Sequence, residues 1–260
     1  MAGGRELEGK HALVTGGGRG IGMAIGRALL EQGARVTLAG RDAGRLAAAV
    51  RMMRPLGDVL QVQMDVTRAD SVRTGFDAAV ARFGPVSILV NNAGQALSAP
   101  FVKTDAALWQ AMLDVNLSGA FHCTQAALPS MLDAQWGRIV NIASTAGLTG
   151  YAYVAAYCAA KHGLIGLTRA LALEVATKGV TVNAVCPGFT DTDLVRDAVD
   201  NIAAKTGRST AQAKAELASR NPQKRLVQPE EVANAVLWLC LPGASAMNGQ
   251  SLPVAGGEVM

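Results

Sequence analysis

Tyr157 and Lys161, four residues apart, are the pair in this chain best suited to transferring a proton. On a helix, a spacing of four places both side chains on one face. A free tyrosine has a pKa of about 10, which is too high for an efficient base at neutral pH. A neighbouring ammonium favours the phenolate, so we expect Lys161 to lower the pKa of Tyr157. The pair predicts chemistry in which a proton moves to or from an oxygen atom.

A glycine-rich turn near the beginning of the chain indicates a second kind of site. Residues 15–22 read Thr-Gly-Gly-Gly-Arg-Gly-Ile-Gly and directly follow a short apolar run. Glycines let the backbone turn tightly and approach a pyrophosphate, and the start of a helix offers free N–H groups and a positive dipole end. The position after a first strand favours a nucleotide site over an ordinary tight turn.

The elements that must position these residues can be read from the alternation of β-branched runs with alanine- and leucine-rich stretches. Strands are expected at residues 11–15, 35–39, 59–65, 87–91, 137–143, 181–186 and 250–254. Helices are expected at residues 20–32, 44–53, 71–83, 106–132, 153–178, 193–206, 210–219 and 229–240. Such alternation predicts parallel strands joined by right-handed crossovers. The expected fold is α/β, a single-domain Rossmann-type doubly wound parallel sheet over residues 1–260, with helices on both faces.

Composition excludes several other classes of protein. The 260 residues are 50% hydrophobic and 17% charged, which excludes a disordered chain. The net charge of +4 is scattered and only 4% of residues are aromatic, so no nucleic-acid partner is expected. Residues 1–10 lack an apolar run and no stretch of eighteen apolar residues occurs, so neither a secretory signal nor a membrane contact is expected. The cysteines and histidines are widely spaced, which predicts no metal site and reduced thiols in a cytoplasmic protein.

Taken in order, these motifs resemble the short-chain dehydrogenase/reductase family over nearly the whole chain. The family's TGxxxGIG pattern is matched in full by residues 15–22. The further motifs are Asn91-Asn92-Ala93-Gly94, Asn116, Ser144, Tyr157-Cys158-Ala159-Ala160-Lys161 and Pro187-Gly188. The resemblance implies hydride exchange between a nicotinamide cofactor and a secondary alcohol or ketone. It makes Tyr157 and Lys161 catalytic, with Ser144 holding the substrate oxygen and Asn116 ordering a water for proton relay.

The end of the second strand bears on which nicotinamide cofactor is used. Gly40 stands where an NAD site usually carries a carboxylate for the ribose. Arg41 follows and Arg19 lies in the glycine turn, and two guanidinium groups suit a 2′-phosphate. In the family such a pair of arginines marks a preference for NADP(H), although NAD(H) is also possible. The alternative interpretation is that Arg41 is a solvated charge paired with Asp42. The expected cofactor contacts are Gly16, Gly18, Arg19, Gly20, Ile21, Gly22, Arg41, Asp65, Val66, Asn92, Ala93, Gly94, Tyr157, Lys161, Pro187, Gly188, Thr190 and Thr192.

The polar stretch from about residue 190 to 222 lies where the family keeps a helical substrate lid. The chain resembles 3-oxoacyl and acetoacetyl thioester reductases and 3-hydroxybutyrate dehydrogenases. The latter bind a carboxylate with a His and a Lys, where this chain has Ala146 and Val154. A 3-oxoacyl or 3-hydroxyacyl thioester of CoA or a carrier protein is therefore expected, and a cyclic or aryl secondary alcohol or a 3-hydroxy acid is the alternative. The expected substrate contacts are Gln95, Ser144, Ala146, Tyr151 and Val154.

The helical stretches 106–132 and 153–178 are apolar over most of their length, which predicts burial on both sides. In the family these helices form a subunit contact, so a homotetramer, or else a homodimer, is expected. A non-catalytic NADP(H)-binding sensor on the same fold is a competing interpretation. Ser144, Tyr157 and Lys161 together favour the enzyme, because a sensor needs neither a base nor its activator.

Overall fold

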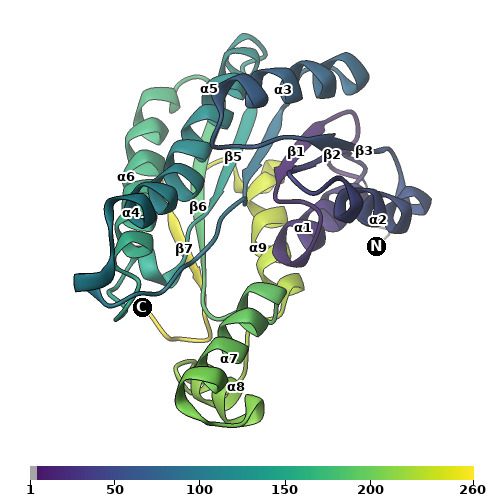
Figure 1. The fold of residues 1–260 in the computed structure, drawn as a ribbon. Helices are drawn as coiled ribbons and strands as arrows, with labels where there is room; N and C mark the ends of the chain where they lie inside the picture. The colour runs from purple at the N-terminus through teal and green to yellow at the C-terminus, as the bar shows by residue number, and fades with distance from the viewer. Residues whose placement is uncertain (1–4) are drawn as a thin grey trace.

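Seven parallel strands form one sheet in the order β3-β2-β1-β4-β5-β6-β7 (Figure 1). The structure is a computed structural model, and it describes residues 5–260 apart from the side chains of Leu194, Asp197, Ala198, Asn201, Ile202 and Lys205. The strands are β1 (His11–Thr15), β2 (Arg35–Gly40), β3 (Val59–Gln63), β4 (Ile88–Asn91), β5 (Gly137–Ile142), β6 (Val180–Pro187) and β7 (Ser251–Val254). The sequence-based prediction of a doubly wound parallel sheet is confirmed.

Helices cover both faces of this sheet (Figure 1). They are α1 (Gly20–Glu31), α2 (Ala43–Met53), α3 (Ala69–Phe83), α4 (Ala106–Leu113), α5 (Gly119–Asp133), α6 (Ala155–Val175), α7 (Asp193–Thr206), α8 (Thr210–Ser219) and α9 (Pro229–Cys240). Helices α1, α2 and α9 pack on one face, and α3, α5 and α6 pack on the other. Because strands covered on both faces have no polar side, they consist of continuous apolar runs.

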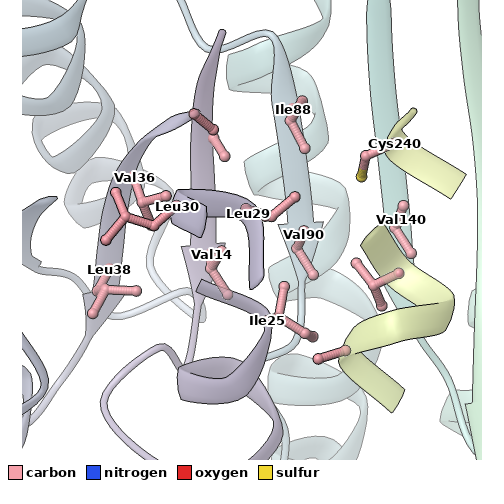
Figure 2. Close-up of a cluster of buried hydrophobic side chains, with 14 of the residues drawn as sticks. Val14, Ile25, Leu29, Leu30, Val36, Leu38, Ile88, Val90, Val140 and Cys240 are labelled. Atoms are coloured by element: carbon pink, nitrogen blue, oxygen red, sulfur yellow. The ribbon is translucent and has the colours of Figure 1, made fainter. Parts of the chain in front are cut away.

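The central strands divide their side chains between the two layers. Val14 and Val90 lie in the cluster with Ile25 and Leu29 of α1, shown in Figure 2. The neighbouring residues of β1 and β4 belong to the opposite cluster, with side chains of α3 and α5. This alternation fixes the strand register, because a slip of one residue would exchange the two layers.

The helix expected at residues 106–132 is divided in the structure. Helix α4 ends at Leu113, a π-helical segment spans Asp114–Ser118, and α5 begins at Gly119. A π segment widens the helix by one residue and is often found at functional sites. The helix expected from residue 153 begins instead at Ala155, because Tyr153 has a φ of +68°, outside the right-handed helical region.

Helices α7 and α8 stand apart from the sheet, beyond the carboxyl end of β6 (Figure 1). They have a small apolar cluster of their own, in which Val195 and Val199 of α7 pack against Ala213 and Leu217 of α8. These two helices lie within the stretch 190–222 that the sequence assigns to a lid. Few contacts tie them to the main core, which is typical of a segment that can move.

The described part of the chain has no helix that is both long and apolar enough to cross a bilayer. Between residues 5 and 260, no group of three or more His, Cys, Asp or Glu side chains is arranged to hold a metal ion. The four cysteines are free thiols.

Candidate active site

A cleft of about 1330 Å³ opens at the carboxyl ends of the strands. It lies where the strand order reverses between β1 and β4, which is where doubly wound sheets bind their ligands. The expected cofactor contacts all line it: Gly16, Gly18, Arg19, Gly20, Ile21, Gly22, Arg41, Asp65, Val66, Asn92, Ala93, Gly94, Tyr157, Lys161, Pro187, Gly188, Thr190 and Thr192. The remaining candidates line it too: Gln95, Asn116, Ser144, Ala146, Tyr151 and Val154. All the site residues predicted from the sequence therefore line one cleft.

The glycine turn at the cleft has no room for side chains. Gly16 has a φ of +65°, and a Cβ on Gly22 would lie 2.4 Å from the Gly16 carbonyl oxygen. Arg19 precedes α1 and its side chain does not cap the helix, so the first-turn N–H groups keep no side-chain partner from that position. Free N–H groups and a helix dipole favour an anion here, and a pyrophosphate fits this cradle.

The loop after β4 is fastened to the glycine turn. The Thr15 hydroxyl accepts hydrogen bonds from the backbone N–H groups of Asn92 and Ala93, both at 2.9 Å. The Asn92 amide donates to the Thr15 carbonyl at 2.9 Å. These bonds hold the two loops that form the floor of the cleft at one fixed separation.

Three arginines surround the end of the cleft beyond β2. Arg41 is exposed, and its guanidinium forms no ion pair with any side chain that the structure describes. Asp42 pairs with Arg45 at 3.3 Å and caps α2 through the Arg45 N–H, so the alternative of an Arg41–Asp42 pair is wrong. Arg19 pairs with Asp193 of α7 at 3.0 Å. Guanidinium groups at this end of the cleft can form ion pairs with an anionic ligand group.

The residues that the sequence predicts to transfer a proton lie on α6 and just after β5. Lys161 is buried, and its Nζ donates to the Ile142 carbonyl at 2.7 Å and lies 5.6 Å from the centre of the Tyr157 ring. Ser144 lies beside Tyr157, where its hydroxyl favours the phenolate form. Ser144 also accepts from the Ala146 N–H at 3.1 Å, which caps the short turn Thr145–Gly147.

Burial governs the ionisation of this group. It raises the pKa of Tyr157, while the hydrogen bond from Ser144 acts in the opposite direction. Burial also lowers the pKa of Lys161 to about 8. The expectation of a lowered pKa for Tyr157 therefore fails in this structure, because removing the phenolate from water outweighs the hydrogen bond that favours it. At neutral pH the phenol holds its proton and can donate it.

Asn116 lies at the centre of the π-helical segment. Its amide nitrogen donates to the Met112 carbonyl at 3.0 Å and to the Gln95 carbonyl at 2.9 Å, and its Oδ1 accepts from the Gln95 N–H at 3.3 Å. A Cβ on Gly94 would lie 2.7 Å from Asn116 Oδ1. The wider turn thus places an amide side chain against the loop that carries Gly94 and Gln95.

The residues expected to contact substrate include apolar side chains and the polar Tyr151. Ala146 is buried, Val154 is half-buried and precedes α6, and Tyr153 is 67% exposed at the rim. The Tyr151 hydroxyl is held by the side chains of Thr145 and Glu258. No histidine or lysine stands at positions 146 and 154 to receive a carboxylate.

Sequence reasoning missed several residues of the cleft. Arg45, Phe189, Asp193 and Arg220 also line it. The position of Arg45, four residues after Arg41 and in the first turn of α2, could have indicated it. Asp193 and Arg220 reach the cleft only because α7 and α8 stand over it, and no local pattern predicts that.

Comparison with known proteins gives the class. Residues 10–203 match the family model described as short chain dehydrogenase. The chain belongs to this family of oxidoreductases.

Several individual proteins are similar to this chain over almost their whole length. It is 40% identical to D-beta-hydroxybutyrate dehydrogenase of Cupriavidus necator, covering 97% of this chain and 99% of the relative. It is also 40% identical to 3-oxoacyl-acyl-carrier-protein reductase of Vibrio cholerae, covering 98% and 99%. A crystal structure of an actinorhodin polyketide ketoreductase variant with NADPH superposes with a TM-score of 0.93 at 39% identity, covering 96% and 97%.

Proposed function

We propose that this enzyme reduces the ketone of 3-oxoacyl thioesters, carried on CoA or on a carrier protein, to the 3-hydroxyacyl form with NADPH. One observation carries the proposal: Ser144, Tyr157 and Lys161 line the same continuous cleft as the glycine turn and its arginines. Similarity to a 3-oxoacyl thioester reductase and to an NADPH-bound ketoreductase supports the same reaction.

Each residue of the site has a distinct task in this reaction. The glycine turn and the loop of Asn92 to Gly94 would hold the dinucleotide, which supplies the hydride when bound. Ser144 would hold the ketone oxygen, and Tyr157 would donate the proton to that oxygen as the alcohol forms. Lys161 would replace that proton, and Asn116 would order the water that resupplies it. A properly placed general acid contributes about 10²- to 10⁴-fold to the rate.

The arginines support a preference for NADPH over NADH, which steady-state assays with acetoacetyl-CoA can test. We expect kcat/KM to be higher with NADPH, and the Arg41→Ala variant to lose this advantage while keeping its kcat/KM for NADH. An unaltered preference in the variant, or a wild-type preference for NADH, contradicts the assignment. NADPH binding without turnover on any ketone would support a sensor instead.

The nature of the substrate can be decided by comparing acetoacetyl-CoA with free acetoacetate and with aryl and cyclic ketones. We expect the thioester to be preferred and free acetoacetate to be poor, because Ala146 and Val154 offer it no charged partner. A second candidate, a bulky cyclic or aryl ketone, is favoured by the size of the cleft and by the similarity to a polyketide ketoreductase.

We also propose that the chain forms a homotetramer. Large apolar side chains are exposed on the outer helices, among them Phe121 of α5 at 43%, Leu173 of α6 at 82% and Trp238 of α9 at 44%. A subunit contact that covers such side chains would remove their apolar surface from water. Light scattering after size-exclusion chromatography tests the mass, and a monomer contradicts the proposal.

A reducing compartment such as the cytoplasm agrees with four free thiols, of which three are buried. Thiol titration of the denatured protein should then find all four.

A further inference from the structure

A chain of hydrogen bonds runs from Glu258, in the C-terminal tail that follows β7 (residues 255–260), through Tyr151 to Thr145, which follows Ser144 in the chain. The Tyr151 hydroxyl lies 2.6 Å from Glu258 Oε1 and 2.8 Å from Thr145 Oγ1. A phenol has one proton, and a carboxylate is the stronger acceptor, so Tyr151 donates to Glu258 and accepts from Thr145. Burial and the Glu258 hydrogen bond raise the pKa of Tyr151 to about 12, which keeps this phenol protonated.

The ring of Tyr151 is held from two further sides. The Arg220 guanidinium lies 5.3 Å from the ring centre, and the Phe189 ring meets it edge-on at 6.3 Å. With its ring packed and its hydroxyl bonded at both ends, Tyr151 is a rigid link rather than a mobile wall of the cleft. Any shift of Glu258 would therefore pass to Thr145.

Thr145 transmits this constraint to the catalytic group. It is buried, and it begins the short turn Thr145–Gly147 that Ser144 caps. The Ser144 hydroxyl accepts from the Ala146 N–H of that turn and acts on the Tyr157 phenol, so its direction depends on the orientation of the turn.

Two glycines allow the C-terminal tail to place Glu258 against Tyr151. A Cβ on Gly188 would lie 2.8 Å from Glu258 Oε2, so the carboxylate occupies space that only a glycine leaves free. Gly256, with a φ of +61°, turns the tail against Asn221, whose Oδ1 lies 2.1 Å from the place of a Cβ. Glu258 Oε2 is buried without a hydrogen-bond partner in the described part of the chain. A buried oxygen left unpaired costs stability, which suggests that Glu258 is kept here for function.

We propose that Glu258 is a positioning residue for ketone reduction. Through Tyr151 and Thr145 it fixes the turn after β5, so that the Ser144 hydroxyl stays directed at Tyr157 and at the ketone oxygen. Glu258 itself does not line the cleft and touches neither substrate nor cofactor. The inference rests on the proposed reaction and adds to it a residue 114 positions beyond Ser144 in the chain.

Four variants test this role: Glu258→Ala, Glu258→Gln, Tyr151→Phe and the double variant Glu258→Ala/Tyr151→Phe. We expect Glu258→Ala to lower kcat for ketone reduction by about 10- to 100-fold, because a small misplacement of reacting groups is costly. The Kd for NADPH should stay unchanged. Glu258→Gln keeps an oxygen that can accept from Tyr151 and should recover most of the rate. The double variant should be no slower than the slower single variant, since both changes break one chain of bonds.

Crystal structures of the same variants show the position of the Ser144 side chain, a measurement that does not depend on which ketone is used in the assay. In Glu258→Ala the Ser144 hydroxyl should shift relative to Tyr157 and lose its hydrogen bond from the Ala146 N–H, and in Glu258→Gln it should keep its place and that bond. The exposed Glu174 near the end of α6 provides a matched control, and Glu174→Ala should keep the wild-type rate.

Three outcomes overturn the proposal: an unchanged kcat in Glu258→Ala, losses that multiply in the double variant, or a Ser144 that keeps its place when Glu258 is removed. A fall in NADPH affinity parallel to the rate would also overturn it, because general loosening would then explain both. A wild-type enzyme that reduces no ketone contradicts the proposed function, whereas the position of Ser144 in the variant crystals still decides the role of Glu258.

Discussion

At the scale of single residues, burial rather than mutual attraction sets the protonation of Tyr157 and Lys161. Burial raises the pKa of Tyr157 and lowers that of Lys161 to about 8. The neutral phenol is the form that donates a proton, which the proposed ketone reduction requires. We therefore expect kcat/KM for reduction to fall as the pH rises past about 8, where Lys161 loses the proton that replenishes the phenol.

The reverse reaction provides the check on this prediction. Alcohol oxidation needs a proton acceptor, so its kcat/KM should rise over the same pH range. Both profiles can be measured with one alcohol–ketone pair under pseudo-first-order conditions. Profiles that move in the same direction would contradict the assignment of Tyr157 and Lys161 as the proton path.

Removing a single oxygen from Tyr157 tests the same group in another way. We expect Tyr157→Phe to lower kcat by about 10²- to 10⁴-fold, because the ketone oxygen then has no proton donor. The Kd for NADPH, measured by fluorescence titration, should not change, since the glycine turn and the arginines are intact. Retained turnover would refute the catalytic role of Tyr157.

At the scale of elements, α7 is held to the glycine turn by charge. Arg19 pairs with Asp193, the first residue of α7, at 3.0 Å. A 2′-phosphate would compete with Asp193 for the same guanidinium. Asp193→Asn should therefore tighten NADPH binding by about two- to fivefold, since an exposed ion pair is worth at most about 1 kcal/mol, and should improve NADH binding less.

A neighbouring carboxylate provides the matched control for this prediction. Asp191 pairs with Arg196 at 3.5 Å and with Lys214 at 3.2 Å, so its pairs do not involve Arg19. Asp191→Asn removes the same charge two residues earlier in the chain and should leave the NADPH affinity unchanged. Equal effects of the two variants would indicate a general electrostatic field instead of competition for Arg19.

The same elements show which parts of the fold and the site can be predicted from the sequence alone. Apolar alternation predicts the strands, and the TGxxxGIG turn and the Tyr157–Lys161 spacing predict where nucleotide and proton chemistry meet. The Arg19–Asp193 pair joins residues 174 positions apart, and the Tyr151–Glu258 bond joins residues 107 apart. No local pattern encodes such contacts, because they depend on where the lid helices and the tail pack. The π segment at Asn116 also escapes prediction, since no residue type in Asp114–Ser118 is specific to a π-helix.

At the scale of the whole molecule, a buried histidine connects two strands of the sheet to the end of helix α3. His11 of β1 donates from Nδ1 to the carbonyl of Gly84, just after α3, at 2.7 Å. Its Nε2 lies 2.9 Å from the Thr37 hydroxyl of β2, and the neutral ring accepts that proton. Burial, the largest influence, lowers the pKa of His11 from its usual 6.5.

This lowered pKa makes the stability of the fold depend on pH in a defined window. The unfolded chain binds the His11 proton more readily than the folded one, so stability is complete above about pH 6.5 and declines below it. The decline is at most about 1.4 kcal/mol per pH unit and stops at the folded pKa. Exposed carboxylates such as Asp70 and Glu231 have a pKa of about 2, so their contributions to stability are lost only at lower pH.

Melting temperatures measured from about pH 8 to about 5 should therefore fall in the wild type and stay level in His11→Gln, which cannot titrate. Parallel curves for the two proteins would show that another group controls the acid lability of the molecule.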